Sequence, residues 1–334
     1  MAAGGSDATR EEDPAFGAPL VRSDGGPPLC VAVVVTWEGG AVTRACVESL
    51  RRSEGANLRI LVVDNGSSAG EREALQAAFA GSSDVELLPL PENRHFAGGV
   101  NAGARRGLEL GAACLFILNN DTVIEPDCVR RLVEAAMAAP DAGAVGPALL
   151  DLREPDRPLS LGERYAAWSL AVPRTLLKVR SQGDGTPYRV GGIMGSAILV
   201  TRDCFLRVGP YREDLLVYYE EVDYCLRARA HGFRPLLVPR AVVLHDGMRG
   251  FTAGLQPYAA RLKCRNQLVL LRAHGTLADW LAFVPIFAGL VVVSSAIYAV
   301  RGRRDVVSAM WRGVVEGVGL AWRGTGAAAT GGAA

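Results

Sequence analysis

The feature that most constrains this chain is the alternation of short apolar runs with helical segments through its first 150 residues. The first run, residues 30–36 (CVAVVVT), is apolar and β-branched almost throughout, which is typical of a strand buried on both faces. Further apolar runs occupy residues 58–63, 85–88, 112–118 and 144–149, and helical spacing occupies 42–51, 71–80, 101–110 and 127–138. This alternation predicts parallel βαβ units and an α/β sheet flanked by helices.

Polar residues follow several of these predicted strands directly. Asp64-Asn65-Gly66 follows the second strand, and Asn119-Asn120-Asp121 follows the fourth. Ligands of open α/β sheets bind at the carboxyl ends of the strands, and a divalent cation bound to phosphate can be held there by one or two carboxylates. Asn and Asp also favour turns, so a plain turn remains the alternative for each motif.

The regular alternation of predicted strands and helices ends after residue 150. Residues 151–190 are rich in Pro, Arg, Gly and Asp and predict a long, partly ordered insertion. A strand is then expected at 197–200, and helical spacing from Val222 places Glu220, Glu221 and Asp223 in the first turn of a helix, where acidic residues complement the helix dipole. Strand-like segments at 235–238 and 241–244 end at His245.

Composition narrows the class of protein. The chain has 334 residues, 49% of them hydrophobic, and a formal net charge of +1, which gives no support for nucleic-acid binding through a broad basic face. Its seven cysteines form no CxxC pair, so we expect buried free thiols in a reducing compartment. Residues 1–27 and 324–334 are expected to be a disordered leader and a disordered tail.

The carboxyl-terminal region is helical and strongly apolar. Residues 280–300 carry no charge and are followed by Arg301, Arg303 and Arg304. About 20 apolar residues can span a bilayer, and flanking arginines favour a cytoplasmic carboxyl side, which in a single span would leave the rest of the chain outside. We therefore expect a re-entrant or interfacial hairpin broken near Pro285 and Gly289, or a helix docked on a partner. A buried core helix is the alternative.

Six motifs and one histidine, in this order, carry a family resemblance. The motifs are VVVT (33–36), VVDNGS (62–67), NRHFAGGVNAG (93–103), LNNDT (118–122), GGIMGSAILV (191–200) and YYEEVDYCLRARAHG (218–232), followed by His245. Over residues 30–275 the chain resembles a family 2 glycosyltransferase of GT-A fold, in the bacterial rhamnosyltransferase-like branch. The resemblance implies a Rossmann-like, mostly parallel mixed sheet flanked by helices, with a C-terminal hydrophobic helical region.

The expected domain organisation follows the same resemblance. Residues 28–255 form the catalytic domain, with a nucleotide-binding half at about 28–150 and an acceptor half at about 190–255. Residues 256–323 form the membrane-associated helical region.

The resemblance implies the residues that bind the donor. Asp64 recognises the nucleoside and Thr36 lines the same pocket, while a helix cap or an Asx turn is the alternative for Asp64. Trp37-Glu38 departs from the Tyr-Asn that is common in the family. The segment from Asn93 to Asn101 resembles the donor loop. There, Gly98 and Gly99 let the backbone approach the ligand, and Asn101 either contacts the nucleotide or caps a helix. Asn120 is also expected to contact the donor.

The resemblance also implies a divalent metal, Mg²⁺ or Mn²⁺, that bridges the two phosphates of the donor. Asp121 is the expected carboxylate ligand, and Asn119 stands where the family often has a first Asp. An amide brings a carbonyl and no charge, so the metal should bind more weakly without donor. His245 is either a second metal ligand or a structural histidine, and an imidazole ligand would favour Mn²⁺.

Glu221 matches the family position of the base that takes the proton of the acceptor hydroxyl, where Asp is more common. Glu220, Asp223 and Gly195 are expected to shape the acceptor site; the alternatives for the acids are to complement the helix dipole or to anchor the helix. Three acids this close should raise one another's pKa. Arg261, Arg265 and Asn266 could meet a lipid-linked pyrophosphate or acidic headgroups, or could form a solvated helix face.

The sequence thus predicts an inverting, metal-dependent glycosyltransferase. It would move rhamnose or another hexose from a dTDP- or UDP-linked donor to a hydroxyl of a glycan or polyprenyl-linked acceptor. We expect it at the cytoplasmic side of the cell membrane, peripheral or anchored through its C-terminus. The alternatives are a nucleotidyltransferase, which should show a basic Gly-rich loop that Gly39-Gly40-Ala41-Val42 lacks, and a non-catalytic sugar-nucleotide-binding protein.

Overall fold

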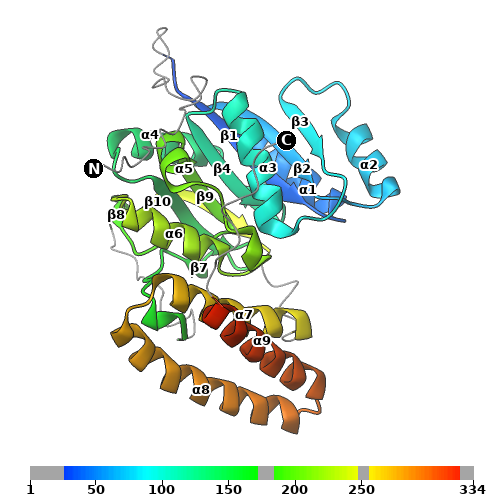
Figure 1. Ribbon diagram of the computed structural model, residues 1–334. Helices are drawn as coiled ribbons and strands as arrows, with labels where there is room; N and C mark the ends of the chain where they lie inside the picture. The colour runs from blue at the N-terminus through cyan, green and yellow to red at the C-terminus, as the bar shows by residue number, and fades with distance from the viewer. Residues whose placement is uncertain (1–25, 172–183, 247–255, 324–334) are drawn as a thin grey trace, which may run out of the picture.

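A mixed ten-stranded sheet forms the centre of the protein in the computed structural model, which describes residues 26–171, 184–246 and 256–323 (Figure 1). The main path of the sheet runs β3-β2-β1-β4-β9-β6-β10-β5, with β7 paired to β6 and β8 paired to β10. The strands are β1 (Leu29–Thr36), β2 (Asn57–Asp64), β3 (Val85–Pro89), β4 (Cys114–Asn119), β5 (Thr122–Ile124), β6 (Ala144–Asp151), β7 (Pro158–Ser160), β8 (Tyr188–Arg189), β9 (Ala197–Thr201) and β10 (Leu236–His245).

The first four strands along the path confirm the parallel βαβ prediction. β1 pairs in parallel with both β2 and β4, and β2 pairs in parallel with β3. In this register Thr36 lies opposite Asp64, and Val35 lies opposite Asn119. The polar residues that follow these strands are therefore brought to one edge of the sheet.

The second half of the sheet is mixed. β9 runs antiparallel to β4 and β6, while β10 runs parallel to β6 and antiparallel to β5. The two segments expected at 235–238 and 241–244 are one strand, β10, whose register shifts between Val238 and Val242. The insertion at 151–190 contributes the short strands β7 and β8, which the sequence did not predict.

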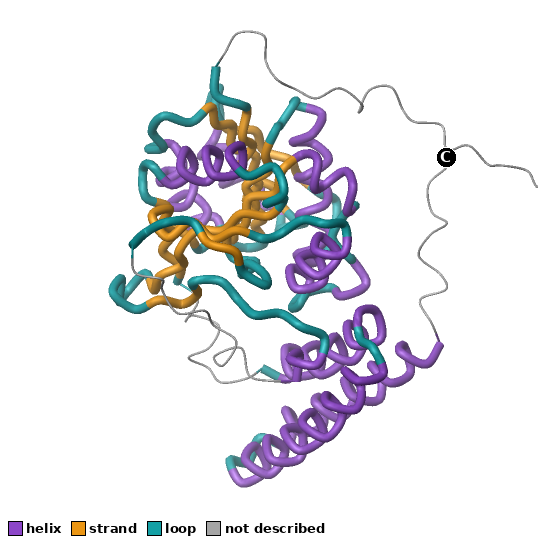
Figure 2. The backbone as a smooth tube through the Cα atoms, turned by 90° about the vertical axis from the view of Figure 1, so that its left-hand side faces the viewer, coloured by secondary structure: helices purple, strands orange, loops and turns teal. Residues whose placement is uncertain are grey.

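Helices cover both faces of the sheet, as Figure 2 shows. They are α1 (Gly40–Arg51), α2 (Ala69–Phe79), α3 (His95–Glu109), α4 (Cys128–Ala138), α5 (Arg202–Val208), α6 (Glu220–Ala230), α7 (Pro257–His274), α8 (Leu277–Val300) and α9 (Arg304–Arg323), with 3-10 turns η1 (Trp168–Ala171) and η3 (Glu213–Leu215). α1, α2 and α4 contribute to one apolar cluster, while α3, α5, α6 and the C-terminal helices contribute to the other.

The burial of strand β1 on both faces explains why apolar and polar residues do not alternate in its sequence. Val31, Val33 and Val35 belong to one buried cluster, and Cys30, Ala32 and Val34 belong to the other. Both faces of the strand are therefore removed from water, as expected for a central strand of a sheet covered on both sides. All seven cysteines are buried and free, which confirms that part of the prediction.

Helix α3 begins earlier than predicted, at His95 instead of near Asn101. Glycines at every fourth position let it lie close to the sheet. A Cβ at Gly99 would lie 2.7 Å from Val35 Cγ1, and one at Gly107 would lie 2.6 Å from Leu115 Cδ2. Gly103 lies between them against Val33 and Val63. A side chain at these positions would push the helix away from β1.

The C-terminal region consists of three helices gathered beneath the α/β body in Figure 1. Helix α8 is continuous through Pro285 and Gly289, so the hairpin break predicted there is wrong; the chain turns instead between Val300 and Arg304. α9 returns and packs along α7. Most of α8 is exposed, with Phe283, Phe287 and Val291 as its buried residues, so the core-helix alternative is also wrong.

Among the described residues, α8 is the one helix long and apolar enough to cross a membrane. The expected leader and tail lie largely or wholly outside the described residues, and the domain boundaries stay a prediction.

Candidate functional site

The ends of β1, β2 and β4 bring the expected donor-binding and metal-binding residues to one edge of the sheet. Thr36 and Asp64 lie side by side, and Asn119 lies at the end of the neighbouring strand. The Asn119 backbone N–H donates to the Ser196 carbonyl at 3.0 Å, which places the loop before β9 at the same edge. The segments expected to bind the donor and the acceptor therefore lie next to each other at this edge.

Asp64 is fully buried and has two partners. Its Oδ1 accepts from the Ser67 backbone N–H at 2.9 Å, and its Oδ2 accepts from Arg72 Nε at 2.7 Å. Burial alone would raise the pKa of Asp64, but the hydrogen bonds from Arg72 and Ser67 and the charge of Arg72 hold it below the usual value. The turn expected as an alternative is therefore present, and the carboxylate is ionised at neutral pH.

Asn120 and Thr36 belong to a small polar network with Thr43. The Asn120 amide donates to Thr36 Oγ1 at 3.2 Å and to Thr43 Oγ1 at 3.1 Å. Thr43 Oγ1 donates in turn to the Gly39 carbonyl at 2.8 Å and shares a hydroxyl–hydroxyl hydrogen bond of 2.8 Å with Thr36 Oγ1. A Cβ at Gly39 would lie 2.5 Å from the Asn120 amide nitrogen, so this glycine makes room for the network. The end of β1 is thereby fixed to the turn after β4.

The unusual pair Trp37-Glu38 has a visible structural role. Glu38 accepts from the Ser68 backbone N–H at 2.6 Å and from the Ser68 hydroxyl at 3.0 Å, and its own N–H donates to Ser67 Oγ. These bonds tie the end of β1 to the start of α2. Trp37 is 58% exposed beside Thr36, so its ring is open to solvent at the edge where the donor pocket is expected.

The segment from Asn93 to Gly99 forms the start of α3. Asn93 Oδ1 accepts from the His95 N–H at 2.8 Å and from Asn65 Nδ2 at 3.2 Å, which fixes the first turn. Gly98 and Gly99 lie inside the helix and are buried. The places where their side chains would be are filled by Arg94, Val35 and Asn65, so these two glycines accommodate protein atoms and do not open the backbone to a ligand.

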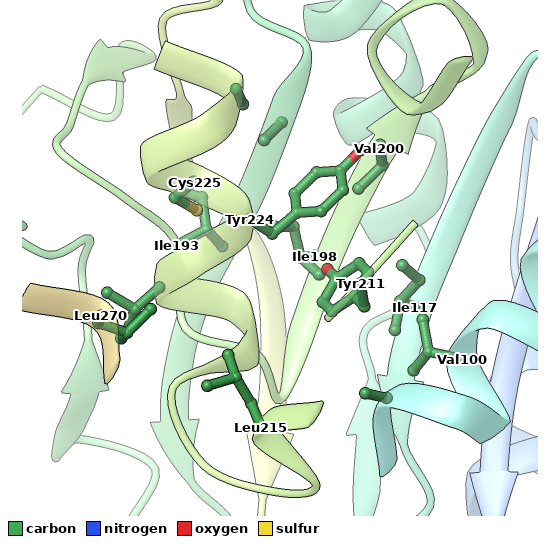
Figure 3. Close-up of a cluster of buried hydrophobic side chains, with 14 of the residues drawn as sticks. Val100, Ile117, Ile193, Ile198, Val200, Tyr211, Leu215, Tyr224, Cys225 and Leu270 are labelled. Atoms are coloured by element: carbon green, nitrogen blue, oxygen red, sulfur yellow. The ribbon is translucent and has the colours of Figure 1, made fainter. Parts of the chain in front are cut away.

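Asn101 lies in the second turn of α3, so the helix-cap alternative is wrong. Its Nδ2 donates to the Tyr211 carbonyl at 2.9 Å and to Glu213 Oε1 at 3.0 Å, and its Oδ1 accepts from the Tyr211 N–H. The buried amide thus joins α3 to the segment that precedes the acidic helix. Figure 3 shows Tyr211 beside Tyr224 of α6, with ring centroids 4.5 Å apart.

Asp121 and His245 come together although 124 sequence positions separate them. β5 pairs with β10 so that Thr122 lies opposite His245, and His245 Nε2 lies 3.1 Å from Asp121 Oδ1. Asn119 Nδ2 lies 3.5 Å from the same imidazole nitrogen, and the Asp246 N–H donates to the Asp121 carbonyl. The β4–β5 turn and the end of β10 therefore form one polar corner.

This corner fits a divalent cation that takes part of its coordination from a ligand. Within the described parts of the chain, no three or more His, Cys, Asp and Glu side chains are grouped so that they alone could hold a metal ion. One carboxylate, one imidazole and an amide carbonyl can contribute to a site whose remaining ligands are phosphate oxygens and water. The side chain of Asp121 is 29% exposed, so the corner is open to such a ligand.

Glu220 and Glu221 open helix α6, as predicted, and both are buried. A Cβ at Gly195 would lie 3.1 Å from Glu221 Cβ and 3.4 Å from its carboxyl carbon. Gly195 therefore lies directly against the side chain of Glu221. Through Ser196 and Asn119, this contact connects the first turn of α6 to the corner that holds Asp121.

Asp223 is fully buried and is enclosed by two arginines and a histidine. Arg227 Nε lies 2.7 Å from its Oδ2, His274 Nε2 lies 2.9 Å from its Oδ1, and Arg212 lies 3.6 Å away. Burial alone would raise the pKa of Asp223, but His274, Arg227 and Arg212 hold it below the usual value. The expectation that the three acids raise one another's pKa is therefore wrong for Asp223, which the structure uses to anchor α6.

A family model, "Glycosyl transferase family 2", matches residues 31–196. An N-acetylglucosaminyl-diphospho-decaprenol L-rhamnosyltransferase of Mycobacterium tuberculosis is 30% identical over 234 residues, which are 64% of this chain and 74% of the relative. The chain is a family 2 glycosyltransferase. A dTDP-rhamnosyl transferase, RfbF, of Shigella flexneri is 24% identical over 64% of the chain and 68% of the relative.

Two solved structures share the fold of this glycosyltransferase. GalNAc-T7, solved with UDP, GalNAc and Mn²⁺, matches 74% of the chain with a TM-score of 0.59 and 15% identity, and the match spans about half of that protein, 48%. The mannosyltransferase PcManGT of Pyrobaculum calidifontis, in complex with GDP-Man and Mn²⁺, matches 91% of both chains with a TM-score of 0.51 and 16% identity. The GT-A fold prediction is confirmed, and the nucleotidyltransferase alternative is wrong.

Asn266 of this glycosyltransferase does not lie at the surface, where the sequence predicted it. It is fully buried, and its Nδ2 donates to the carbonyls of Leu215, Val217 and Tyr218 at 2.8–3.1 Å, so it neither meets a headgroup nor lies on a solvated face. Leu216, Tyr218 and Tyr219 have positive φ, a conformation that non-glycine residues adopt at an energetic cost. The amide of Asn266 thus holds the strained loop that leads into the acidic helix.

Arg261 and Arg265 also make contacts within the protein. Arg261 pairs with Glu316 of α9 at 2.9 Å, and Arg265 donates to the Asp214 carbonyl at 2.8 Å and to Asn266 Oδ1 at 2.6 Å. Arg261 therefore joins α7 to α9, whereas Arg265 joins α7 to the segment that precedes α6.

Sequence reasoning missed several residues of the glycosyltransferase site. Arg227, four residues after Asp223, could have been recognised from the helical i,i+4 spacing of opposite charges. Arg72 lies eight residues after Asp64, with no periodic signal that links them. His274 contacts Asp223 across 51 positions, and no local pattern predicts that pairing.

Proposed function

We propose that this glycosyltransferase inverts the anomeric centre of the sugar it transfers, and that the sugar is rhamnose or another hexose carried by dTDP or UDP. The acceptor is a hydroxyl of a glycan linked to a polyprenyl lipid. The observation that carries the proposal is the continuous contact path at one sheet edge: Asp64 and Thr36, Asn119 and Ser196, then Gly195 and Glu221. The names of the two rhamnosyltransferase relatives support the choice of sugar and acceptor.

The donor would lie over the ends of β1, β2 and β4. The ionised Asp64 accepts hydrogen bonds, which suits an imide N–H of the base or a ribose hydroxyl. Thr36 and Asn120 lie at the ends of neighbouring strands, with Asn93 at the start of α3, so they would contact the nucleoside and phosphates. The buried positions of Gly98, Gly99 and Asn101 suggest an indirect role in which they fix α3 beside this pocket.

The metal-binding residues in this proposal are Asp121 and His245, with Asn119 beside them. A bound Mg²⁺ or Mn²⁺ would neutralise charge on the diphosphate that leaves with the nucleoside. Asp121 would contribute the negative charge, and an imidazole nitrogen of His245 would be a second ligand, which favours Mn²⁺. The Asp246 N–H bond to the Asp121 backbone holds this turn in place.

Glu221 is the proposed general base. Its carboxylate takes the proton of the acceptor hydroxyl as that oxygen forms a bond to the anomeric carbon. The bond from this carbon to the phosphate oxygen breaks, and its electron pair leaves with the nucleoside diphosphate. Because attack comes from the face opposite the leaving group, the configuration inverts.

The acceptor would enter beside Gly195, which lies directly against the side chain of Glu221. Glu220 borders the same turn, whereas Asp223 acts by fixing α6 through Arg227 and His274. A bulkier residue at position 195 would displace either the acceptor or the base.

We further propose that the enzyme works at the cytoplasmic side of the cell membrane, peripheral or anchored through α8. Helix α8 exposes Leu277, Leu281, Val292, Val293 and Val300, and such a continuous apolar surface marks a membrane or protein contact. An enzyme that uses soluble sugar nucleotides and has seven free thiols is suited to a reducing compartment.

The test is transfer from dTDP-rhamnose and from UDP-sugars to a polyprenyl-diphosphate-linked GlcNAc, with the product resolved by mass and anomeric configuration. Glu221→Gln keeps the size of the side chain and removes the base, so transfer should fall by about 10²–10⁴-fold while nucleoside diphosphate binding is retained. Glu221→Asp should keep partial activity. Full transfer by Glu221→Gln would exclude this base, whereas donor binding without any transfer by the wild type would support the non-catalytic alternative.

A further inference from the structure

A second concave site lies outside the proposed donor and acceptor sites. It is a hollow of about 540 Å³ whose lining includes four arginines, and we call it the arginine hollow. Its lining residues are Arg164, Arg189, Val190, Gly191, Arg229, Gly232, Phe233, Arg234 and Pro235. The lining contains no Asp or Glu, so the hollow presents positive charge from three separate segments of the chain.

The arginine hollow is separated from the proposed chemistry by the length of α6. Glu221 lies in the first turn of this helix and Arg229 lies in its last turn, so eight residues place them about 12 Å apart along the axis. Pro235 precedes β10 at its amino end, whereas His245 lies at the carboxyl end of the same strand. The hollow therefore lies toward the opposite edge of the sheet from the metal corner.

Two of the four guanidinium groups are engaged with the protein. Arg189 forms an ion pair with Asp141 and donates to the Arg234 carbonyl, and Arg229 donates to the Tyr165 carbonyl at 2.6 Å. Asp141 is the one carboxylate among the described residues that forms an ion pair with any of the four. Its single charge leaves most of the positive charge uncompensated.

The other two guanidinium groups are available to a ligand. The side chains of Arg164 and Arg234 are exposed, and within the described ranges they make no hydrogen bond or ion pair. Holding four cations around one concavity is unfavourable unless an anion shares it, since like charges repel and a concave wall concentrates the field. The charges of Arg164 and Arg234 are not needed for contacts within the described protein, so they are available to bind an anion in the hollow.

Phosphate is the anion that this arrangement fits. A guanidinium presents a planar fork of N–H donors that matches two oxygens of a phosphate, and clusters of arginines are a recurrent means of phosphate recognition. Four guanidinium groups offer more N–H donors than the two oxygens of a single carboxylate can accept. Two linked phosphates offer more acceptor oxygens and more than two negative charges. The volume of about 540 Å³ is ample for a diphosphate.

We propose that the arginine hollow binds the phosphate groups of a diphosphate or phospholipid headgroup, as a site separate from the donor site. Arg164 and Arg234 make the direct contacts, and Arg189 and Arg229 are held by Asp141 and Tyr165 at the wall. The inference stands independently of the transfer chemistry, because it rests on charge and shape at the far end of α6.

The first experiment measures binding of inorganic pyrophosphate to the full-length protein by equilibrium dialysis in metal-free buffer, so that metal-dependent binding at the donor site is absent. The test variant is Arg164→Ser/Arg234→Ser. The matched control is Arg59→Ser/Arg105→Ser, which removes the same charge from two exposed arginines outside the hollow. Because the side chains of Arg164 and Arg234 make no hydrogen bond or ion pair within the described residues, both variants should fold, which thermal melting verifies.

The test variant should bind pyrophosphate on the order of 100-fold more weakly, since two charge-assisted hydrogen-bonding groups are lost, and the control should match the wild type within about threefold. Nucleoside diphosphate binding with Mn²⁺ should be equal in all three proteins. Equal pyrophosphate affinity in the test and control variants, or no measurable binding to the wild type, would overturn the proposal.

A second arm identifies the source of the phosphate. Vesicles of phosphatidylglycerol and phosphatidylcholine are compared with vesicles of phosphatidylcholine alone, by co-sedimentation of the same three proteins. If Arg164→Ser/Arg234→Ser loses pyrophosphate binding and also the preference for anionic vesicles, the hollow takes lipid headgroups. If it loses pyrophosphate binding alone, the ligand is a diphosphate presented outside the bilayer surface.

Discussion

His274 Nε2 lies 2.9 Å from Asp223 Oδ1, and this contact joins the last turn of α7 to the first turn of α6. Gly275 and Thr276 follow His274 directly, and Thr276 caps the apolar helix α8 with Asp279 in a capping box. The helix that carries the proposed base is therefore fixed to the junction from which the apolar helix α8 begins. A displacement of α8 at this junction would therefore move Glu221 through the contact between His274 and Asp223.

We expect His274→Ala to lower the free energy of unfolding by about 1–3 kcal/mol, because it leaves one oxygen of a buried carboxylate without its partner. The turnover number should fall more than the apparent affinity for donor, since the donor-binding strands are untouched. Urea unfolding and steady-state transfer kinetics check both effects. His274→Gln, which can still donate to Asp223, should recover much of the loss; equal defects in both variants would contradict the positioning role.

The Asp223 pKa predicts how stability depends on pH. Its folded-state pKa is below the unfolded value of about 3.9, so its contribution is present above that value and is lost as pH falls through the folded pKa. We expect Asp223→Asn to be less stable than the wild type by about 3 kcal/mol at pH 7. The difference should shrink below pH 4, as measured by urea unfolding from pH 7 to pH 2.5. A constant difference over this range would show that the charge of Asp223 is not what stabilises α6.

The Asp121–His245 pair predicts separate effects on metal binding. Asp121→Asn removes the one carboxylate of the corner and should raise the Mn²⁺ concentration for half-maximal activity by at least about tenfold. His245→Asn should weaken the preference for Mn²⁺ over Mg²⁺, because a nitrogen ligand is replaced by an oxygen ligand. Metal titrations of transfer activity measure both. If the Mn²⁺ preference of His245→Asn equals that of the wild type, His245 is structural.

Gly99 and Gly70 form a matched pair for testing how α3 is packed. A Cβ at Gly99 would lie 2.7 Å from Val35 Cγ1, so Gly99→Ala should destabilise the protein by about 1–3 kcal/mol and shift the donor edge. Gly70 lies in α2 with no atom within 4 Å of the place of its Cβ, so Gly70→Ala should stabilise the protein by about 0.4–1 kcal/mol. Thermal unfolding of both variants provides the comparison, and equal effects would refute the close-packing argument.

If α8 contacts the membrane, charged residues introduced on its exposed face should release the protein from the membrane. Leu281 and Val293 are 70% and 56% exposed on this helix, so Leu281→Arg/Val293→Arg should keep the fold while opposing insertion into hydrocarbon. We expect the variant to move from the membrane fraction to the soluble fraction after lysis and sedimentation. The control, Arg52→Ser/Arg105→Ser, alters exposed residues outside the C-terminal helices and should remain with the membranes.

The sequence by itself determined the longer strands of the first half of the sheet and the places where polar residues follow them. β1 could be recognised as buried on both faces because an apolar run without alternation has no solvent face. Glu220, Glu221 and Asp223 could be placed in the first turn of a helix because helical spacing is local. The carboxyl-terminal helices were predicted as a region for the same reason.

Only the tertiary structure decided which distant residues meet. The 124-residue separation of Asp121 and His245 is closed by the antiparallel pairing of β5 with β10, and β5 is three residues long, too short to show a period. Gly98 and Gly99 were predicted to lie in a loop. In the structure they lie inside α3, where Gly99 lets the helix pack closely on β1. His274 and Asn266 gained their roles from the way α7 packs on α6, because contacts between helices depend on register and distance in space, which local sequence patterns do not encode.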